Sequence, residues 1–265
     1  MTLLIVAGHH RSGTSLLGRV LAEAELFLGD RLMSATAANP YGHFEDLDVV
    51  RIHDRILHSH GLTWQVDRPF VPTIPTDVMD EIRDFATARQ DAHRVWAFKD
   101  PRVCLFLPLW KHLVPEAKVI ITVRHPAACT ESLERRQVRD MLERRGDTEQ
   151  GWRFWTSADH GLRLWLTYNA CLRRCALAYP DDCLVTSFDQ IRQGRPVVAE
   201  INRRWELGLS EIDSAALFDE NVVTADRATA KGITAEDPEL AERARTLWSE
   251  LSDLARTDSR QGSLL

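Results

Sequence analysis

The stretch from Leu3 to Ser15, LLIVAGHHRSGTS, decides the fold class of this chain. Its first five residues are all apolar, which predicts a strand buried on both faces, as in a parallel sheet. A loop from Gly8 to Gly13 follows, and apolar residues then recur at helical spacing up to Leu28, with Gly29 placed to end the helix. The stretch therefore predicts a strand, a glycine loop and a helix, the first unit of an α/β fold.

The glycine loop has the spacing G-x-x-x-x-G-x-[ST] from Gly8 to Ser15. A loop of this shape turns its backbone N–H groups inward around phosphate oxygens at a helix N-terminus. Loops that bind nucleoside triphosphates carry a lysine directly after the second glycine. Here Thr14 stands at that position, and the only strong cation in the loop is Arg11. We therefore expect a P-loop that holds a phosphate group without the usual lysine.

Three further apolar runs predict strands, at residues 95–98, 118–123 and 183–187. Helices are expected from about Glu45, after a cap at Thr76 or Asp77, and in one long run between Trp152 and Tyr179. Prolines at first-turn positions predict three more helices, which begin at residues 126, 196 and 238. Strands that alternate with helices indicate an α/β fold, a single domain over residues 1–265 with a mainly parallel central sheet flanked by helices.

Composition restricts the class of protein. The chain has 265 residues, of which 44% are hydrophobic and 27% are charged, as in ordinary globular proteins. Its net charge of −6 argues against a broad nucleic-acid surface. No apolar run approaches the roughly 20 residues that cross a bilayer, and the first residues do not resemble a signal peptide. The odd number of cysteines, five, without a CxxC pair, favours reduced thiols. These features predict a cytoplasmic protein without a membrane span or a nucleic-acid partner.

The segment RSGTSLL, residues 11–17, resembles the 5′-phosphosulfate loop of the P-loop sulfotransferases, [RK]-x-G-[ST]-[ST] after the first strand. The resemblance implies the P-loop NTPase-like sulfotransferase fold. It also implies 3′-phosphoadenosine 5′-phosphosulfate (PAPS) as the donor, adenosine 3′,5′-bisphosphate as the product, and no required metal. The donor-binding residues that it implies in the loop are His10, Arg11, Ser12, Gly13, Thr14 and Ser15.

A second motif lies at the end of the third predicted strand, where Arg124 is followed by His125, Pro126 and, further on, Ser132. The 3′-phosphate site of the same family has an arginine at a strand end and a serine at this spacing. An arginine offers paired planar donors to a phosphate, and the dipole of the following helix favours the same anion. The resemblance covers residues 3–133, the core that carries these motifs, whereas residues 205–265 are expected to form a helical region without recognisable motifs.

Two segments offer residues for sulfuryl transfer. Glu45 follows the first helix, where the carbohydrate and tyrosylprotein branches of the family have a glutamate base, and His43 is the alternative base because other branches use a histidine. The second segment is KDPR, residues 99–102, directly after the second strand. The resemblance implies that Lys99 helps stabilise the transferring group, together with Arg11. Asp100 is expected to orient Lys99 or Arg11, and Arg102 either binds an anionic acceptor or forms a salt bridge.

Other features have less specific interpretations. We expect His9 and His10 to pack against or shape the loop. The arginines of residues 135–145 are expected to form a solvated helix face, with the alternative that some approach the 3′-phosphate or an acidic acceptor. Tryptophans such as Trp64 are candidates to line an acceptor pocket, whereas the spacing of Trp152 and Trp155 favours a helix core. Two other functions remain open, a P-loop kinase or NTPase that uses ATP and Mg²⁺, and a non-catalytic protein that binds adenosine 3′,5′-bisphosphate. The acceptor is a small molecule or a glycan, and a carbohydrate, a glycosylated natural product, a lipid and a phenol all stay possible.

Overall fold

A computed structural model describes residues 1–34, 42–144, 148–212 and 232–264. Its strands are β1 (Thr2–Ala7), β2 (Val95–Lys99), β3 (Lys118–Val123) and β4 (Cys183–Ser187). Its helices are α1 (Thr14–Glu23), α2 (Leu47–Ser59), α3 (Thr76–Ala92), α4 (Leu107–Leu113), α5 (Pro126–Leu142), α6 (Thr148–Thr156), α7 (His160–Ala178), α8 (Phe188–Arg192), α9 (Val197–Trp205) and α10 (Pro238–Leu264), with a 3-10 turn, η1 (Pro101–Leu105).

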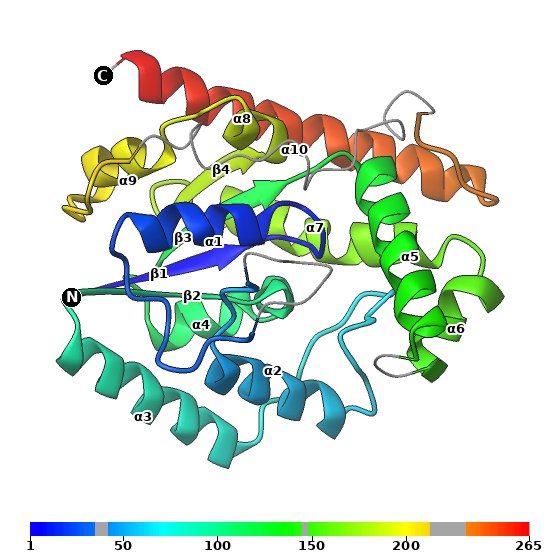
Figure 1. Cartoon of the computed structure of the whole chain (residues 1–265), viewed down its shortest axis with the longest axis horizontal. Helices are drawn as coiled ribbons and strands as arrows, with labels where there is room; N and C mark the ends of the chain where they lie inside the picture. The colour runs from blue at the N-terminus through cyan, green and yellow to red at the C-terminus, as the bar shows by residue number, and fades with distance from the viewer. Residues whose placement is uncertain (35–41, 145–147, 213–231, 265) are drawn as a thin grey trace.

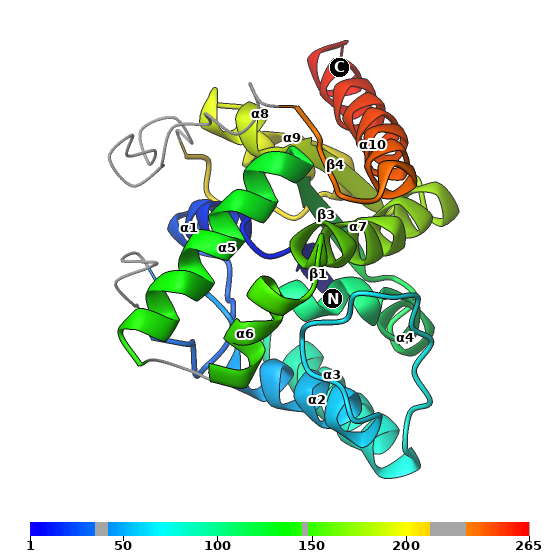
Figure 2. The same cartoon turned by 90° about the vertical axis from the view of Figure 1, so that its right-hand side faces the viewer.

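The four strands form one parallel sheet in the order β2-β1-β3-β4. The predicted α/β fold with a parallel central sheet is therefore confirmed, as a single domain. Because β1 is central, the glycine loop at its carboxyl end lies between the ends of β2 and β3. Figures 1 and 2 show α5 and α6 beyond the carboxyl ends of the strands, the edge at which open α/β sheets bind their ligands.

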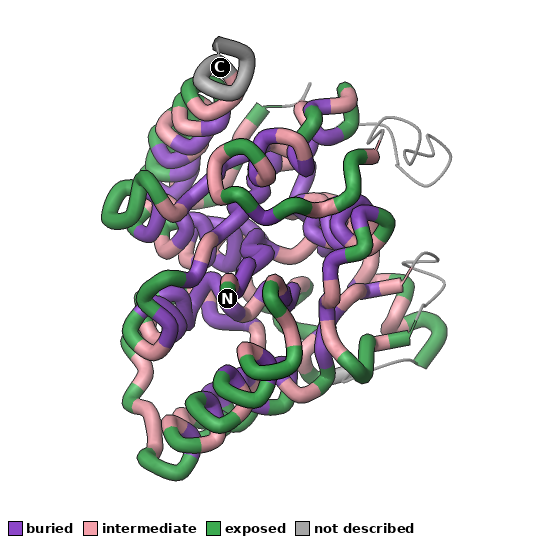
Figure 3. The backbone as a smooth tube through the Cα atoms, turned by 90° about the vertical axis from the view of Figure 1, so that its left-hand side faces the viewer, coloured by how far each residue is buried: buried purple, intermediate pink, exposed green. Residues whose placement is uncertain are grey.

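Apolar side chains cover both faces of the sheet, which explains why its strands are continuous apolar runs. On β1, Leu3, Ile5 and Ala7 pack into one core with α2, α3, α4, α7 and α10. Leu4 and Val6 point the other way and pack against α1 and α9. Figure 3 shows the buried residues along the sheet and on the inner sides of the surrounding helices.

Both edges of the sheet have hydrogen-bonding partners outside the strands. At the β4 edge, Val185 donates its N–H to the Asp258 carboxylate of α10 at 2.7 Å, and its carbonyl accepts from Arg195 at 2.9 Å. At the β2 edge, the N–H of Ala97 donates to the carbonyl of Phe27 at 2.8 Å. The outer strands therefore do not present a full row of unpaired backbone groups to solvent.

The first helix is shorter than predicted. We expected it to reach Leu28 and end at Gly29, but α1 ends at Glu23. Glu25 adopts a left-handed φ of 62°, which turns the chain out of the helix. Leu26 and Leu28 are still buried, because the segment after the helix lies beside β2. Their apolar character therefore reflects burial in the core and not a longer helix.

The single long helix expected between Trp152 and Tyr179 is wrong. The chain forms two helices, α6 and α7, with a break at Asp159, whose φ of 54° is left-handed. Trp152 and Trp155 are exposed by 52% and 62%, so their assignment to a helix core is also wrong. The two indole rings contact one another with centroids 6.4 Å apart.

Other boundaries differ by one or two residues. Asp46 is the N-cap of α2 and its side chain accepts from the N–H of Asp48 at 3.0 Å, so Glu45 precedes the helix. Pro75 is the N-cap of α3, and Pro196 is the N-cap of α9. Tyr41, Arg145 and much of the expected loop and C-terminal region, residues 35–41 and 213–231, lie outside the described residues. Within the described part, no helix is long and apolar enough to cross a membrane.

Candidate active site

The N-termini of two helices, α1 and α5, follow the neighbouring strands β1 and β3. Neither helix has a side-chain cap, and neither has an acidic residue in its first turn. Uncapped backbone N–H groups and the positive end of the helix dipole favour an anion at such a position. Two of these positions at one edge of the sheet suit a ligand with two separate anionic groups.

The backbone of the glycine loop depends on two left-handed residues. Gly13 has a φ of 98°, and Arg11 has a φ of 67°. A Cβ added at Gly13 would lie 2.6 Å from the Phe188 ring, so both the conformation and the space require glycine there. Thr122 of β3 donates its hydroxyl to the carbonyl of Ser12 at 3.1 Å. The loop is therefore fixed to the central strands.

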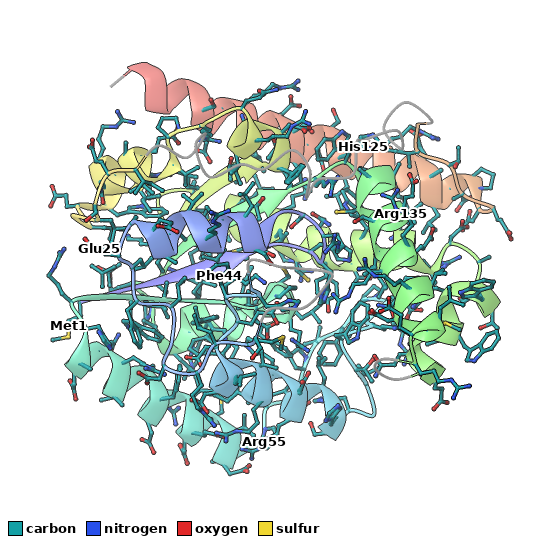
Figure 4. All side chains as sticks on the ribbon, viewed as in Figure 1. Met1, Glu25, Phe44, Arg55, His125 and Arg135 are labelled. Atoms are coloured by element: carbon teal, nitrogen blue, oxygen red, sulfur yellow. The ribbon has the colours of Figure 1, made fainter. Side chains whose placement is uncertain are left out.

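Arg11 of the glycine loop lies in contact with Arg124 and Ser132 of the second predicted motif. Arg11 Nε donates to Ser132 Oγ at 3.0 Å, and Arg124 Nη1 donates to the carbonyl of Arg11 at 3.1 Å. The Arg124 guanidinium also stacks on Phe188, with its carbon 4.4 Å from the ring centroid. Beside this group lies His125, which Figure 4 labels near the start of α5. Its ring contacts Trp248 of α10 with centroids 5.5 Å apart.

The charge around Arg11 is strongly positive. Burial, together with the neighbouring charges of Arg136 and Arg124, lowers the pKa of Arg11 from 12.5 to about 10. No carboxylate pairs with Arg11 among the residues that the structure describes. A buried cation without an acidic partner is costly unless an anion joins it. The cluster therefore has the charge of a phosphate or sulfate site.

Lys99 and Glu45 form a buried ion pair on the other side of the loop. Lys99 Nζ lies 2.7 Å from Glu45 Oε1 and 3.3 Å from Ser15 Oγ, so the lysine joins the loop to the glutamate. Both charged side chains are buried, with residue exposures of 1% and 7%. Lys99 is at the carboxyl end of β2, where its neighbour in the sheet is Val6 of β1. This register places the Lys99 backbone beside the start of the glycine loop.

Asp100 does not orient Lys99 or Arg11, and that expectation is wrong. Asp100 Oδ2 lies 2.6 Å from Nδ1 of His53, and Asp100 Oδ1 accepts from Arg102 at 2.9 Å. Trp110 donates its indole N–H to Nε2 of His53 at 2.9 Å. His53 must therefore carry its proton on Nδ1 and donate it to Asp100. Burial alone would raise the pKa of Asp100, but Arg102 and His53 lower it well below its usual range.

Arg102 forms salt bridges, which was one of the two roles expected for it. It lies 2.8 Å from Asp54, 2.9 Å from Asp100 and 3.9 Å from Glu45. Although burial opposes the effect, these carboxylates raise the pKa of Arg102. The sequence indicated neither His53 nor Asp54 nor Trp110 as part of this network. The only signal for His53 and Asp54 was their place as polar side chains on a helix that precedes the KDPR segment, whereas Trp110 follows that segment on α4.

A pocket of about 180 Å³ lies beside this network, and Glu45, His43 and His10 are among the residues that line it. Burial lowers the pKa of His43, and the charges of Lys99, Arg136 and Arg11 lower it further while Glu45 opposes them. His43 is therefore a neutral base near pH 7. Arg136 of α5 also lines the pocket with a partly exposed side chain, so this arginine fits the alternative that some of them approach the ligands.

His9 and His10 shape the loop through ring contacts. His9 is fully buried, and its ring centroid lies 5.1 Å from that of Tyr168. Burial lowers its pKa from 6.5 to about 3. The His10 ring lies 4.6 Å from that of Trp64, and burial lowers its pKa well below 6.5. The packing expected for His9 and His10 agrees with these contacts, and Trp64 lines the pocket beside Glu45, one of the two places considered for the tryptophans.

A sequence model of the family described as "Sulfotransferase family" matches residues 4–194, well over half of the chain. The chain belongs to the sulfotransferase family. It is therefore an enzyme, and the family implies PAPS as the sulfuryl donor. Membership of this family favours the enzymatic interpretation over a kinase or a non-catalytic binding protein. No curated protein sequence matches the chain.

Two solved structures resemble the chain at low identity. Sulfotransferase STF1 from Mycobacterium tuberculosis H37Rv is 16% identical, with a TM-score of 0.44 over 96% of this chain and 77% of its own. Retinol dehydratase, solved in complex with androsterone and the inactive cofactor PAP, is 12% identical, with a TM-score of 0.38 over 94% of this chain and 80% of its own.

Proposed function

We propose that this sulfotransferase transfers the sulfuryl group of PAPS to a hydroxyl group, with Glu45 as the general base and without a metal. When bound, PAPS supplies an activated sulfuryl group, whose transfer leaves adenosine 3′,5′-bisphosphate. The observation that carries the proposal is the arrangement of charged side chains at one sheet edge. Arg11 contacts Arg124 there, and Lys99 pairs with Glu45 beside the glycine loop that leads into the uncapped helix α1.

Arg124 and Ser132 are proposed to hold the 3′-phosphate. Because Ser132 Oγ accepts from Arg11, its own hydrogen is available to donate to a phosphate oxygen. The uncapped N-terminus of α5 adds its dipole to the same position. The backbone N–H groups of residues 13–15 are proposed to hold the 5′-phosphosulfate, with His10 completing the loop. The Ser12 N–H donates to the His9 carbonyl at 3.1 Å, so Ser12 is proposed to contribute its hydroxyl. Ser12 supports this fit, because its buried hydroxyl has no hydrogen-bond partner among the described residues.

Lys99 is proposed to stabilise the transferring group. An ammonium group has three hydrogens to donate, and in this structure two of them are directed to Glu45 and Ser15. The third is available for a sulfuryl oxygen, where negative charge grows in the transition state. Arg11 is proposed to add positive charge from the other side of the loop. Both residues should then contribute more to turnover than to donor affinity.

Glu45 is proposed to remove the proton of the acceptor hydroxyl. Its carboxylate lines the pocket and is fixed by Lys99 at 2.7 Å, with Arg102 at 3.9 Å. His43 lines the same pocket and is the alternative base, because its lowered pKa keeps it unprotonated. A base close to the acceptor oxygen typically contributes about 10²–10⁴ in rate.

Two measurements test the proposal. Adenosine 3′,5′-bisphosphate should raise the melting temperature of the protein, because it binds only the folded state. The protein should also release adenosine 3′,5′-bisphosphate from PAPS in the presence of EDTA, when extracts that contain hydroxyl compounds are added. Turnover that requires ATP and Mg²⁺, with none from PAPS, would contradict the proposal. Binding of the bisphosphate without any sulfation would restrict the protein to a binding role.

A further inference from the structure

The pocket beside Glu45 has a wall composed mainly of polar side chains. Among the residues that the structure describes, only Met33, Trp64 and Met141 contribute apolar side chains to it, and the other lining residues are polar or charged. Pockets that bind lipids or phenols are lined mainly by hydrophobic and aromatic residues. An apolar acceptor buried against this wall would separate the polar groups of the wall from water without replacing their hydrogen bonds. The wall therefore suits an acceptor that carries several hydroxyl groups.

The charges on this wall compensate one another. Arg136 Nε lies 3.3 Å from Asp140 Oδ2, and both residues line the pocket. Arg102 is already paired with Asp54 and Asp100 and lies 3.9 Å from Glu45. The two arginines thus have carboxylates of their own, in contrast to Arg11 in the donor loop. An anionic acceptor would have to displace one of these carboxylates, so an uncharged acceptor suits the pocket better.

One side of the pocket is aromatic. Trp64 contacts His10 and Phe154, with ring centroids at 4.6 and 6.4 Å, and its carbonyl accepts from the Tyr168 hydroxyl. The Nε2 atom of His10 is buried and has no hydrogen-bond partner among the described residues. The pocket thus has an aromatic surface beside the unpartnered His10 nitrogen and the side-chain amides of Gln137 and Gln150. This combination fits a ring that has apolar C–H faces and hydroxyl groups around its edge.

We propose that the acceptor is an uncharged polyhydroxylated ring, a neutral glycosyl unit, that lies against Trp64 and directs one hydroxyl to Glu45. Gln137 of α5, which is only 9% exposed, lines the same pocket and can both donate to and accept from ring hydroxyls. This inference rests on the proposed function, since it assigns the reacting hydroxyl to the pocket of the proposed base. In the reaction, the sulfur–oxygen bond to the donor phosphate breaks, a new one to the oxygen of the acceptor hydroxyl forms, and the hydroxyl proton passes to Glu45.

The experiment compares acceptors with the full-length enzyme and PAPS. The panel contains neutral methyl glycosides and short oligosaccharides, the corresponding uronic acids, a simple phenol and a long-chain alcohol. We expect kcat/KM to be highest for neutral sugars. A phenol, a long-chain alcohol or a uronic acid used better than every neutral sugar would overturn the inference. So would a complete absence of sugar sulfation by protein that binds adenosine 3′,5′-bisphosphate.

Substitutions test whether the pocket determines the preference for neutral sugars. Gln137→Leu removes hydrogen-bonding groups from the wall and should raise KM for the best glycoside roughly tenfold, the scale of one hydrogen bond. Its affinity for adenosine 3′,5′-bisphosphate should not change. Arg135→Leu is the matched control on the same helix, because its side chain is half exposed and pairs with Glu131 outside the pocket. Equal KM values for Gln137→Leu and wild type would overturn the inference.

The donor measurements distinguish a failure of the proposed function from a failure of the proposed acceptor class. If the bisphosphate fails to stabilise the wild-type protein and no acceptor is sulfated, then the proposed function itself is wrong. If the bisphosphate binds and a phenol or an alcohol is sulfated, the proposed function holds and only the acceptor class is wrong.

Discussion

The ammonium group of Lys99 lies 2.7 Å from Oε1 of Glu45, and both side chains are buried. The residue proposed to act on the donor therefore contacts the residue proposed to act on the acceptor. Removing one partner of a buried ion pair leaves the other charge uncompensated and destabilises the fold. Substitutions that preserve the shape and the hydrogen bond are for this reason the most informative tests of either role.

Glu45→Gln removes the basic carboxylate but retains an oxygen that can accept from Lys99. We expect kcat to fall by roughly 10²–10⁴, the range for general-base catalysis, with little change in donor affinity. Steady-state kinetics and bisphosphate titrations measure the two effects. Asp48→Asn is the control, because Asp48 pairs with Arg31 and Arg51 and is not part of the pocket. An active Glu45→Gln enzyme beside an inactive His43→Asn enzyme would identify His43 as the base.

Lys99→Met replaces the ammonium group with an apolar chain of similar length. The expected loss is about 10²–10³ in kcat, the scale of one preorganised charge donor. Because the change leaves Glu45 without its nearest partner, thermal unfolding must be recorded with the kinetics. Lys118→Met removes a lysine of β3 that pairs with Asp182 instead, and it should remain active. Unchanged kcat in Lys99→Met would remove Lys99 from the mechanism.

Arg124→Ala tests the 3′-phosphate site. The variant should bind adenosine 3′,5′-bisphosphate more weakly by about 1.5–3 kcal/mol, the scale of a charged set of hydrogen bonds. AMP lacks the 3′-phosphate, so its affinity should be almost equal for variant and wild type. Isothermal titration with both nucleotides gives the comparison. If AMP and the bisphosphate lose affinity equally, Arg124 does not contact the 3′-phosphate.

The buried His9 predicts how stability depends on pH. Burial lowers its pKa from 6.5 to about 3, so His9 stays neutral in the folded state at pH values where the unfolded chain binds a proton. The stability contributed by this difference is fully present above pH 6.5 and is lost as the pH falls toward 3. Its slope is at most about 1.4 kcal/mol per pH unit.

Urea unfolding between pH 7 and 4 measures this slope. The variant His9→Phe has no group that titrates in this range, so its slope should be smaller than that of wild type. His9→Gln serves as a second variant if the larger ring does not fit. His58→Gln is the control, because His58 is exposed near the end of α2. An identical pH dependence for wild type and both His9 variants would contradict the prediction.

The sequence predicted the elements whose signals are local. Buried strands appear as continuous apolar runs, and the glycine loop and Pro126 mark the starts of two helices, so β1–β4, α1 and α5 were expected near their observed positions. The breaks at Glu25 and Asp159 could not be predicted, because neither residue is a glycine, although both have a left-handed φ. Tertiary packing decides such positions, and it leaves little trace in the amino-acid pattern.

The site was predictable only where a motif has a fixed spacing. Arg11 was expected in the 5′-phosphosulfate loop, and Arg124 with Ser132 at the 3′-phosphate site; the three residues lie in contact. The contact between Asp100 and His53 could not be predicted, because these residues are 47 positions apart in the sequence and meet only when α2 packs against η1. The acceptor pocket likewise combines residues from distant segments, so its polar wall could not be predicted from the sequence.

The hydrogen bonds at the outer edge of β4 have a consequence for how the protein is produced. The family match ends at residue 194, yet the carboxylate that satisfies the Val185 N–H belongs to Asp258. A shorter chain cut at the end of the match would keep both phosphate motifs but would leave an apolar strand with its edge uncovered. Such strands pair with other chains, so the shortened protein should aggregate during expression. The C-terminal helix thus protects the sheet from self-association, and expression of the catalytic core requires it.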